Sequence, residues 1–357
     1  MNITLMVKLM PTTEQHNALL GTMERFNAAC GAIAAVAFEL HTANKIRLQQ
    51  VVYDDIRKRF GLSSQMTVRA IAKTCEAYKR DKSILPTFKP HGAMVYDQRL
   101  LSWKGLDRVS ILTLDGRILV PIVYGAYQAA RLKRIRGQAD LIYRDGTFYL
   151  AVVVDVPEPP KGTPDGWLGV DLGIANIAVD SDGESFSGAQ VNGLRHRHAR
   201  LRQRLQSKGT KSTKRLLKKR RRKEARFAAN ENHRIAKKIV TKAKDTGRGI
   251  SLEDLNGIRD RVTVRKAQRR QHHSWSFHQL RSFIEYKAIL AGILVRSVDP
   301  RNTSRTCPAC GHVDKKNRPT RDKFECVECG FAGPADHIAA INIGRRAAVI
   351  LPYAGVI

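Results

Sequence analysis

Four cysteines near the end of the sequence form the clearest chemical pattern in the chain. Cys307, Cys310, Cys326 and Cys329 follow a C-x2-C-x15-C-x2-C spacing within CPACGHVDKKNRPTRDKFECVECG. Each C-x2-C pair forms a knuckle that brings both thiolates to one side, and four thiolates complete a closed tetrahedral shell around Zn²⁺. Two disulfides are the competing interpretation, but paired knuckles in a basic chain without a secretory pattern favour zinc. Because a closed shell leaves no position for water, we predict a structural zinc ion.

Three carboxylates stand at the ends of predicted elements. Asp171 ends the apolar run GWLGVD, Glu253 ends RGISLE with Asp254 beside it, and Asp336 lies where a final helix should begin. Carboxylate oxygens are the ligands that Mg²⁺ prefers, so these acids could share a metal site. An acid at a strand or helix end is more often a cap or a surface residue, so the residues alone leave both interpretations open.

A strongly basic segment separates two of these acids. Between Leu194 and Arg226 there are sixteen Lys or Arg residues and one acidic residue, Glu224. A solvated helical face is one interpretation, but the segment lies between two predicted core strands, so we expect an ordered helix pair or a long loop that binds phosphates. The predicted nucleic-acid contacts are Arg195, Arg197, Arg202, Lys214, Arg215, Lys218, Arg220 and Arg221 here, and Arg305, Arg318, Arg321 and Lys323 around the cysteines.

The charge of the whole chain points to a polyanionic partner. Lys and Arg number 63 against 32 Asp and Glu, which gives a formal net charge of +31. Such an excess is far beyond what solubility requires and suits nucleic acid or an anionic membrane. The sequence has no apolar run of about 18 residues, and MNITLMVKLMPTTEQ lacks a signal-peptide layout. We therefore expect nucleic acid as the partner, no membrane association and a cytoplasmic location.

The first half of the chain alternates between strand and helix patterns. A loosely alternating stretch ends at Pro11, and apolar residues at helical spacing follow from Thr13 to about Lys82. Short β-branched runs separated by Asp-Gly turns then fill residues 95–156, which predicts an antiparallel barrel or sheet. Because one strand precedes the helices, we expect a helical domain at 13–83 inserted into a β domain made of 1–12 and 84–160, closed by a Pro-rich linker.

The second half predicts an α/β domain that carries the acids. A hairpin with Asp171 at the end of its first strand is followed by the basic helices, a strand ending at Glu253, a further helix and another strand. The cysteine element then occupies 304–333 and a final helix follows. The expected α/β domain therefore comprises 161–303 and 334–357, with the zinc ribbon inserted between its parts.

Several motifs in this half resemble those of the TnpB family. They are VDLG at 170–173, LEDL at 252–255, TSRTCPACGHVDKKNR with CVECG, and AD followed by AAINI, in family order from about Gly166 to Arg346. The first 160 residues look compatible but less distinctive. Where the family commonly has Asn ahead of the double alanine, this chain has Ile338. TnpB proteins are insertion-sequence-encoded, RNA-guided DNA nucleases, similar to the ancestors of type V CRISPR effectors.

The resemblance implies a fold and an activity. The fold is a multidomain α+β chain: a wedge-like N-terminal β-barrel with an inserted helical recognition lobe, then an RNase H-like, RuvC-type nuclease domain with the inserted ribbon. Asp171, Glu253 and Asp336 match the catalytic carboxylates, which would hold two Mg²⁺ ions for phosphodiester hydrolysis. The partners would be a guide RNA and a double-stranded DNA target beside a short flanking motif. We favour a monomer, although the sequence leaves the oligomeric state open.

Two other functions remain open at this point. One is an RNA-guided DNA-binding repressor that does not cut. The other is a non-guided zinc-ribbon nucleic-acid-binding protein that assists transposition. A cleavage assay with Mg²⁺ separates the first from the nuclease, and the absence of co-purified RNA would support the second.

Overall fold

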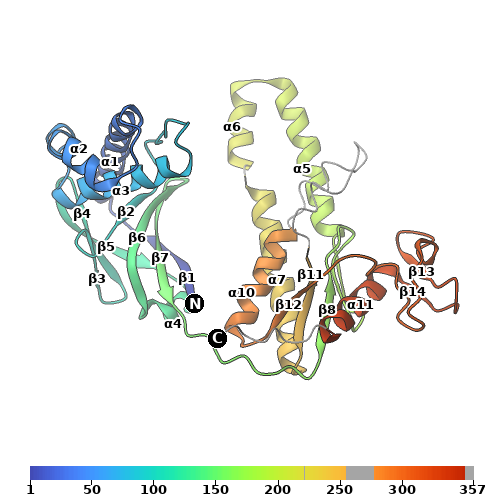
Figure 1. Cartoon of the computed structure of the whole chain (residues 1–357). Helices are drawn as coiled ribbons and strands as arrows, with labels where there is room; N and C mark the ends of the chain where they lie inside the picture. The colour runs from blue at the N-terminus through green and yellow to red at the C-terminus, as the bar shows by residue number, and fades with distance from the viewer. Residues whose placement is uncertain (221, 255–276, 350–357) are drawn as a thin grey trace. The chain divides into compact units, whose positions relative to one another are not determined.

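The structure is a computed structural model that describes residues 1–220, 222–254 and 277–349. Arg221, one of the predicted nucleic-acid contacts, and Leu255, the last residue of the LEDL motif, lie outside the described residues. The chain divides into two compact units, Met1–Pro157 and Glu158–Ile357, which are described separately below (Figure 1). Within the described part, none of the helices combines the length and the apolar character needed to cross a membrane.

The first unit is built on one antiparallel sheet of seven strands. Their order across the sheet is β2-β6-β7-β1-β5-β4-β3. The strands are β1 (Asn2–Leu9), β2 (Met94–Tyr96), β3 (Leu101–Lys104), β4 (Arg108–Thr113), β5 (Gly116–Val123), β6 (Ile135–Arg144) and β7 (Thr147–Asp155). The two outermost strands, β2 and β3, follow each other directly in the chain. The sheet therefore curls until it is nearly closed, which agrees with the antiparallel barrel or sheet expected from the sequence.

Tight turns set the register of this sheet. Between β6 and β7, Asp145 has φ 49° and Gly146 has φ 82°. Two consecutive positive φ angles define a type I′ turn, whose twist matches that of the flanking strands, and Asp-Gly is a preferred sequence for it. The turn predicted at this dipeptide is confirmed, and the register runs on from Arg144 opposite Thr147.

Three helices lie between β1 and β2 in the chain, where the sequence predicts a helical block. They are α1 (Thr13–Glu39), α2 (Lys45–Phe60) and α3 (Ser64–Arg80), and a short α4 (Ala126–Leu132) follows β5. A capping box starts α1: the Thr12 hydroxyl accepts from the Gln15 N–H, and the Gln15 side chain accepts from the Thr12 N–H. The helices share one hydrophobic core with the sheet, in which Phe26, Tyr78 and Phe148 are fully buried.

The second unit contains a mixed sheet of five strands in the order β10-β9-β8-β11-β12. The strands are β8 (Trp167–Asp171), β9 (Asn176–Asp180), β10 (Ser185–Ser187), β11 (Gly249–Glu253) and β12 (Val295–Val298). The first three pair antiparallel, whereas β8, β11 and β12 run parallel. The predicted hairpin is therefore present as β8 and β9, and β10 extends it by a strand that the sequence pattern did not predict.

Helices α7 and α10 cover one face of this sheet (Figure 1). The unit contains α5 (Ala189–Lys208), α6 (Lys211–Arg220), α7 (Lys223–Asp245), α10 (Phe277–Leu290) and α11 (Ala335–Val349). Ile239 and Ile284 from the helices pack in one cluster with Val170 and Leu252 from the strands. The basic segment forms α5, α6 and the start of α7, which agrees with the expected helices rather than with a long loop. Helix α6 buries none of its residues.

Helix α11 packs on the other face, directly against β8. Gly169 allows this approach, because a Cβ there would lie 1.9 Å from the Ala340 carbonyl oxygen and 2.5 Å from the Gly344 nitrogen. No other residue fits such a backbone contact. The strand and the helix are therefore in contact through their backbones.

Candidate active site

The pairing of β8 with β11 brings Asp171 and Glu253 to the same end and the same face of the sheet. Leu252 pairs with Val170, so the next residue of each parallel strand is one of the two acids. Side chains alternate between the faces of a strand. Since Val170 and Leu252 belong to the core beneath α7 and α10, Asp171 and Glu253 face the side on which α11 packs.

Asp336 comes to this place from α11. It is the second residue of the helix, whose backbone packs on β8 at Gly169, two residues before Asp171. A carboxylate in the first turn of a helix is also stabilised by the helix dipole. The structure therefore brings together the three acids that the sequence singled out, from three separate elements.

The electrostatics of Asp171 show how closely the acids interact. Burial, together with the carboxylates of Glu253 and Asp336, raises the pKa of Asp171 to about 8, against the opposing effects of Arg318 and the Leu172 N–H. Burial also raises the pKa of Glu253. Neighbouring carboxylates that disfavour one another's charged forms are characteristic of sites that hold a cation or exchange protons.

Specific hydrogen bonds hold two of the acids. The Thr303 hydroxyl donates to Glu253 Oε1 at 2.5 Å, and Asn176 Nδ2 donates to Asp336 Oδ2 at 3.0 Å. Arg318 Nη2 lies 3.5 Å from Asp336 Oδ1 and 2.6 Å from the Arg321 carbonyl oxygen. Arg318, which the sequence suggested as a contact to a nucleic-acid backbone, therefore has its guanidinium beside the acids.

The three carboxylates fit a hard divalent cation by their chemistry. They supply only oxygen ligands and they repel one another. A bound cation would offset both the cost of burying a charged carboxylate and the repulsion, the two effects that raise the pKa of Asp171. The cysteine cluster is more compact: it is the group within the described residues whose possible ligand atoms all lie within 4.8 Å of one another, and the three acids do not form such a group.

The four cysteines form a zinc-binding cluster. The Sγ atoms of Cys307 and Cys329 are 3.6 Å apart, as are those of Cys310 and Cys326. Four sulfurs placed tetrahedrally about 2.3 Å from a zinc ion would be about 3.8 Å apart, so the spacing fits. Burial raises the pKa of Cys307, but hydrogen bonds from the N–H groups of Cys310 and Ala309 and from the Cys329 and Cys310 thiols outweigh it and lower this pKa to about 7, whereas the contacts with the other thiols raise the pKa of Cys310.

A buried amide ties the two knuckles together. Asn317 is fully buried at the end of a short 3-10 helix, η1 (Lys315–Asn317). Its Nδ2 donates to the carbonyl oxygens of Arg305 and His312 in the first knuckle, and its Oδ1 accepts from the Val327 N–H in the second. The hairpin of β13 (Lys323–Glu325) and β14 (Ala332–Pro334) then leads into α11, so the ribbon ends where Asp336 begins its helix.

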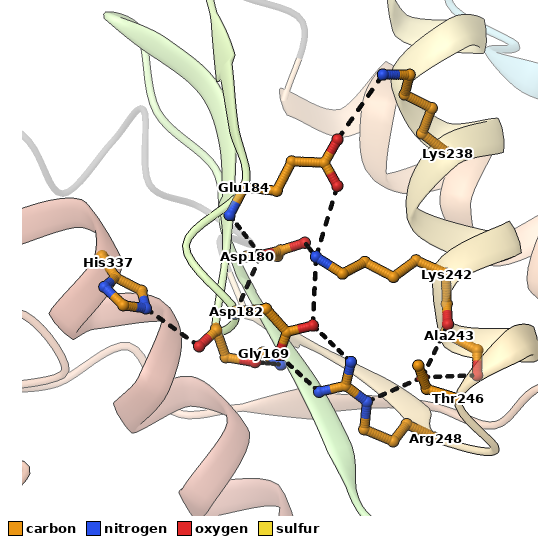
Figure 2. A network of polar contacts seen from close by, with 11 residues as sticks. Gly169, Asp180, Asp182, Glu184, Lys238, Lys242, Ala243, Thr246, Arg248 and His337 are labelled. Atoms are coloured by element: carbon orange, nitrogen blue, oxygen red, sulfur yellow. Dashed lines mark hydrogen bonds and ion pairs between the residues drawn. The ribbon is translucent and has the colours of Figure 1, made fainter.

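A charged network holds the turn between β9 and β10 (Figure 2). Asp180, which has no exposed surface, accepts from Lys242 Nζ of α7 at 2.6 Å and from two backbone N–H groups of its own turn. Arg248 pairs with Asp182 in the same turn at 2.6 Å. Ser181, between these acids, bonds to Gly169 through its hydroxyl and to His337 of α11 through its carbonyl oxygen. The network therefore anchors the turn that contacts both acid-bearing elements, β8 and α11.

The predicted nucleic-acid contacts differ in exposure. Arg197, Arg202, Lys214, Arg215, Lys218, Arg305, Arg321 and Lys323 are exposed, whereas Arg195, Arg220 and Arg318 are half-buried. Glu224 neutralises part of the basic segment, since it lies 3.1 Å from Arg202 and 3.9 Å from Arg195. Apart from Arg202, the exposed cations of α5 and α6 lie on the surface of these two helices, where phosphates could reach them.

Sequence reasoning missed the residues that hold the acids. Asn176 is a single polar residue in unremarkable surroundings, and Thr303 and Asn342, although they lie within the TSRTC and AAINI motifs, show their roles only through their contacts. For Thr303 the available signal was its place immediately before the cysteine element. Nothing in the sequence pattern distinguished Asn176 from an ordinary turn residue.

Family models match two parts of the chain. A model described as "Probable transposase" covers residues 151–256, and one described as "Cas12f1-like, TNB domain" covers residues 277–343. The first match includes Asp171 and Glu253, and the second includes the four cysteines and Asp336.

Known relatives resemble different lengths of the chain. The chain is 41% identical over 120 residues to the CRISPR-associated endodeoxyribonuclease Cas12f1 of Sulfoacidibacillus thermotolerans, a match that covers 33% of this chain and 27% of that protein. The chain matches less than half of the length of this and two further Cas12f1 relatives. The chain also resembles a protein chain in a cryo-EM structure of a Cas12f1-sgRNA-target DNA complex. The two superpose with a TM-score of 0.62 at 17% identity, and the match covers 91% of this chain and 82% of that one. The likeness shows a similar mixed α/β multidomain fold.

A shorter relative is matched almost completely. The TnpB-like protein of Methanocaldococcus jannaschii is 31% identical over 262 residues, which is 67% of this chain and 91% of that protein. The chain belongs to the TnpB family.

Proposed function

We propose that this protein is an RNA-guided DNA endonuclease whose second unit is an RNase H-like, RuvC-type nuclease domain. The observation that carries the proposal is the convergence of Asp171, Glu253 and Asp336 from β8, β11 and α11. Acids that served only as separate caps or surface residues, the alternative left open by the sequence, would not be expected to raise the pKa of a buried Asp171 together. The names of the Cas12f1 relatives, which are endodeoxyribonucleases, support the same activity.

The three acids would hold two Mg²⁺ ions. When bound, such ions activate a water molecule and stabilise the leaving oxygen of a phosphodiester. Asp171, Glu253 and Asp336 would supply the carboxylate oxygens that hold these ions, and bound cations would offset the effects that raise the pKa of Asp171. Arg318 contributes the positive charge nearest to Asp336, and the zinc ribbon that carries Arg318 keeps it there.

A guide RNA and a double-stranded DNA target are the proposed partners. The structural neighbour is a complex of Cas12f1 with sgRNA and target DNA, and the exposed cations of α5 and α6 would bind a nucleic-acid backbone. We assign the sheet of residues 1–12 and 84–160 to a wedge-like domain and residues 13–83 to a recognition lobe, which would read a short motif beside the target. Such a protein would work in a prokaryotic cytoplasm, on the nucleoid when bound to DNA.

A plasmid-cleavage assay tests this function. The protein is purified with its bound RNA, the RNA is sequenced, and plasmids with and without the matching target are incubated with Mg²⁺. We expect cutting of the matched plasmid alone, its loss in Asp171→Ala, and full retention in Asp245→Asn, which changes an exposed acid at the end of α7. Intact matched plasmid, or equal cutting by the wild type and Asp171→Ala, would refute the proposal.

A further inference from the structure

The Glu253 carboxylate is held by a single buried hydroxyl group. Thr303 Oγ1 lies 2.5 Å from Glu253 Oε1, and Thr303 is 2% exposed. Thr303 belongs to the loop that joins β12 to the first cysteine knuckle, so it is distant from Glu253 in sequence. We propose that Thr303 is a positioning residue, which fixes the Glu253 carboxylate for metal binding and couples the zinc-bearing loop to the acids. The inference rests on the function proposed above.

The hydroxyl has a clear effect on the carboxylate. Burial raises the pKa of Glu253, and the hydrogen bond from Thr303 opposes this effect by stabilising the ionised form. A glutamate also has three side-chain torsions, so without a partner its carboxylate would sample several rotamers. A donor at this distance selects one of them and fixes the direction in which the carboxylate points.

Thr303 is itself held by the helix that carries Asp336. Asn342 of α11, which is 5% exposed, donates from Nδ2 to the carbonyl oxygens of Thr303 and Thr306, both at 2.8 Å. Two consecutive links, from Asn342 to the Thr303 backbone and from the Thr303 hydroxyl to Glu253, therefore join α11 to β11. The same loop continues into Cys307, so folding of the first knuckle determines where Thr303 lies.

A purely local role is the competing explanation. Thr303 Oγ1 is also 3.0 Å from the Pro300 carbonyl oxygen. On this explanation the hydroxyl only stabilises its own loop and has no effect on Glu253. That role would affect the loop and the knuckle but would not depend on the bond to Glu253. The neighbouring Thr306 provides a matched control, because its hydroxyl donates to the Asn302 carbonyl oxygen at 2.8 Å within the same loop.

The test compares Thr303→Val, Thr303→Ser and Thr306→Val in the full-length protein with its zinc and RNA. Cleavage is measured against Mg²⁺ concentration, and zinc content is measured for each variant. Loss of a residue that orients a metal ligand typically costs about 10- to 100-fold in affinity or activity, and we expect such a loss in Thr303→Val. Thr303→Ser keeps the hydroxyl and should stay within about threefold of the wild type, as should Thr306→Val. Zinc content should be equal in all of them.

A second readout does not depend on cleavage of DNA. Fe²⁺ replaces Mg²⁺, and with ascorbate and peroxide it produces hydroxyl radicals that cut the polypeptide next to the bound iron. We expect a fragment that ends near Glu253 in the wild type and in Thr303→Ser, and its loss in Thr303→Val and Asp171→Ala. If the wild type gives this fragment without cutting DNA, the endonuclease proposal fails while the positioning role remains supported.

Three results would overturn the inference. Thr303→Val could retain the wild-type Mg²⁺ dependence and iron-dependent fragment, which would show that Glu253 needs no donor. Thr303→Ser could be as defective as Thr303→Val, so that the methyl group rather than the hydroxyl matters. Thr306→Val could lose activity and zinc to the same degree, which would assign the effect to the loop as a whole.

Discussion

Replacing Lys242 by Met should destabilise the second unit strongly, because Lys242 pairs with a buried carboxylate. Lys242 Nζ lies 2.6 Å from Asp180, whose side chain is buried, and the change removes the cation in direct contact with that carboxylate (Figure 2). Breaking a buried ion pair costs about 3–5 kcal/mol when one charge stays behind. Two backbone N–H groups still donate to Asp180, and the Lys242 side chain is 24% exposed, so we reduce the expected cost to about 2–3 kcal/mol.

The assay is thermal unfolding of the variant beside the wild type. For a unit of this size each kcal/mol shifts the Tm by about 2–4 °C, so the Tm should fall by about 4–12 °C. Adding Asp180→Asn removes the stranded charge and should restore part of the loss. Lys238→Met is the matched control on the same helix, because Lys238 is 54% exposed and 3.7 Å from Glu184, and a surface pair of this kind is worth about 0–1 kcal/mol.

Two results would refute this reasoning. One is an equal change of Tm in Lys242→Met and Lys238→Met, which would mean that burial of Asp180 gives the pair no special weight. The other is a double variant that is less stable than Lys242→Met alone, which would mean that the lone carboxylate is not the source of the loss.

Three further predictions follow from the same contacts. Without added Mg²⁺, the free energy of unfolding should fall as the pH rises from about 4 to 8, because the pKa of Asp171 is raised to about 8 in the folded state. Asp171→Asn should therefore raise the Tm more at pH 8 than at pH 5, and it should also abolish cutting. The Arg248 guanidinium, with Lys242, lowers the pKa of Asp182 to about 2. The ionised Asp182 therefore stabilises the folded state by about 1 kcal/mol after allowance for solvent, and this contribution is present above about pH 4 and lost toward pH 2. The acid unfolding of Arg248→Met should lack this loss of stability. Cys326→Ser should lower both the zinc content and the folded yield, and normal zinc stoichiometry in that variant would contradict a four-thiolate site.

Much of the acid site could be predicted from local patterns. Asp171 and Glu253 each end a short apolar run, and the alternation of side chains along a strand places each acid opposite its apolar neighbour. Local patterns do not say which strands pair. The parallel pairing of β8 with β11 depends on the helices between them, so the resemblance to a known family, rather than periodicity, indicated that the acids meet.

The contacts around the acids could not be predicted in the same way. Arg318 is one of several cations beside the cysteines, and its position next to Asp336 follows from the path of the ribbon. The burial of Asp180 is also invisible in the sequence, since an acid in an Asp-Gly-rich turn normally faces water. Both depend on tertiary packing that single residues do not encode.

The direct backbone contact at Gly169 and Gly344 has a consequence for the choice of cation. It packs the main chain of β8 directly on that of α11, so the backbones that carry Asp171 and Asp336 have little freedom to move apart. Magnesium has ligands at about 2.0–2.1 Å and calcium at about 2.3–2.6 Å, so a larger ion needs a wider cage. Any widening would have to come from Glu253, the acid with the longer side chain and a hydroxyl for its support. If the three acids hold metal ions as proposed, a backbone contact between two glycines would favour a small ion such as Mg²⁺ over a larger one.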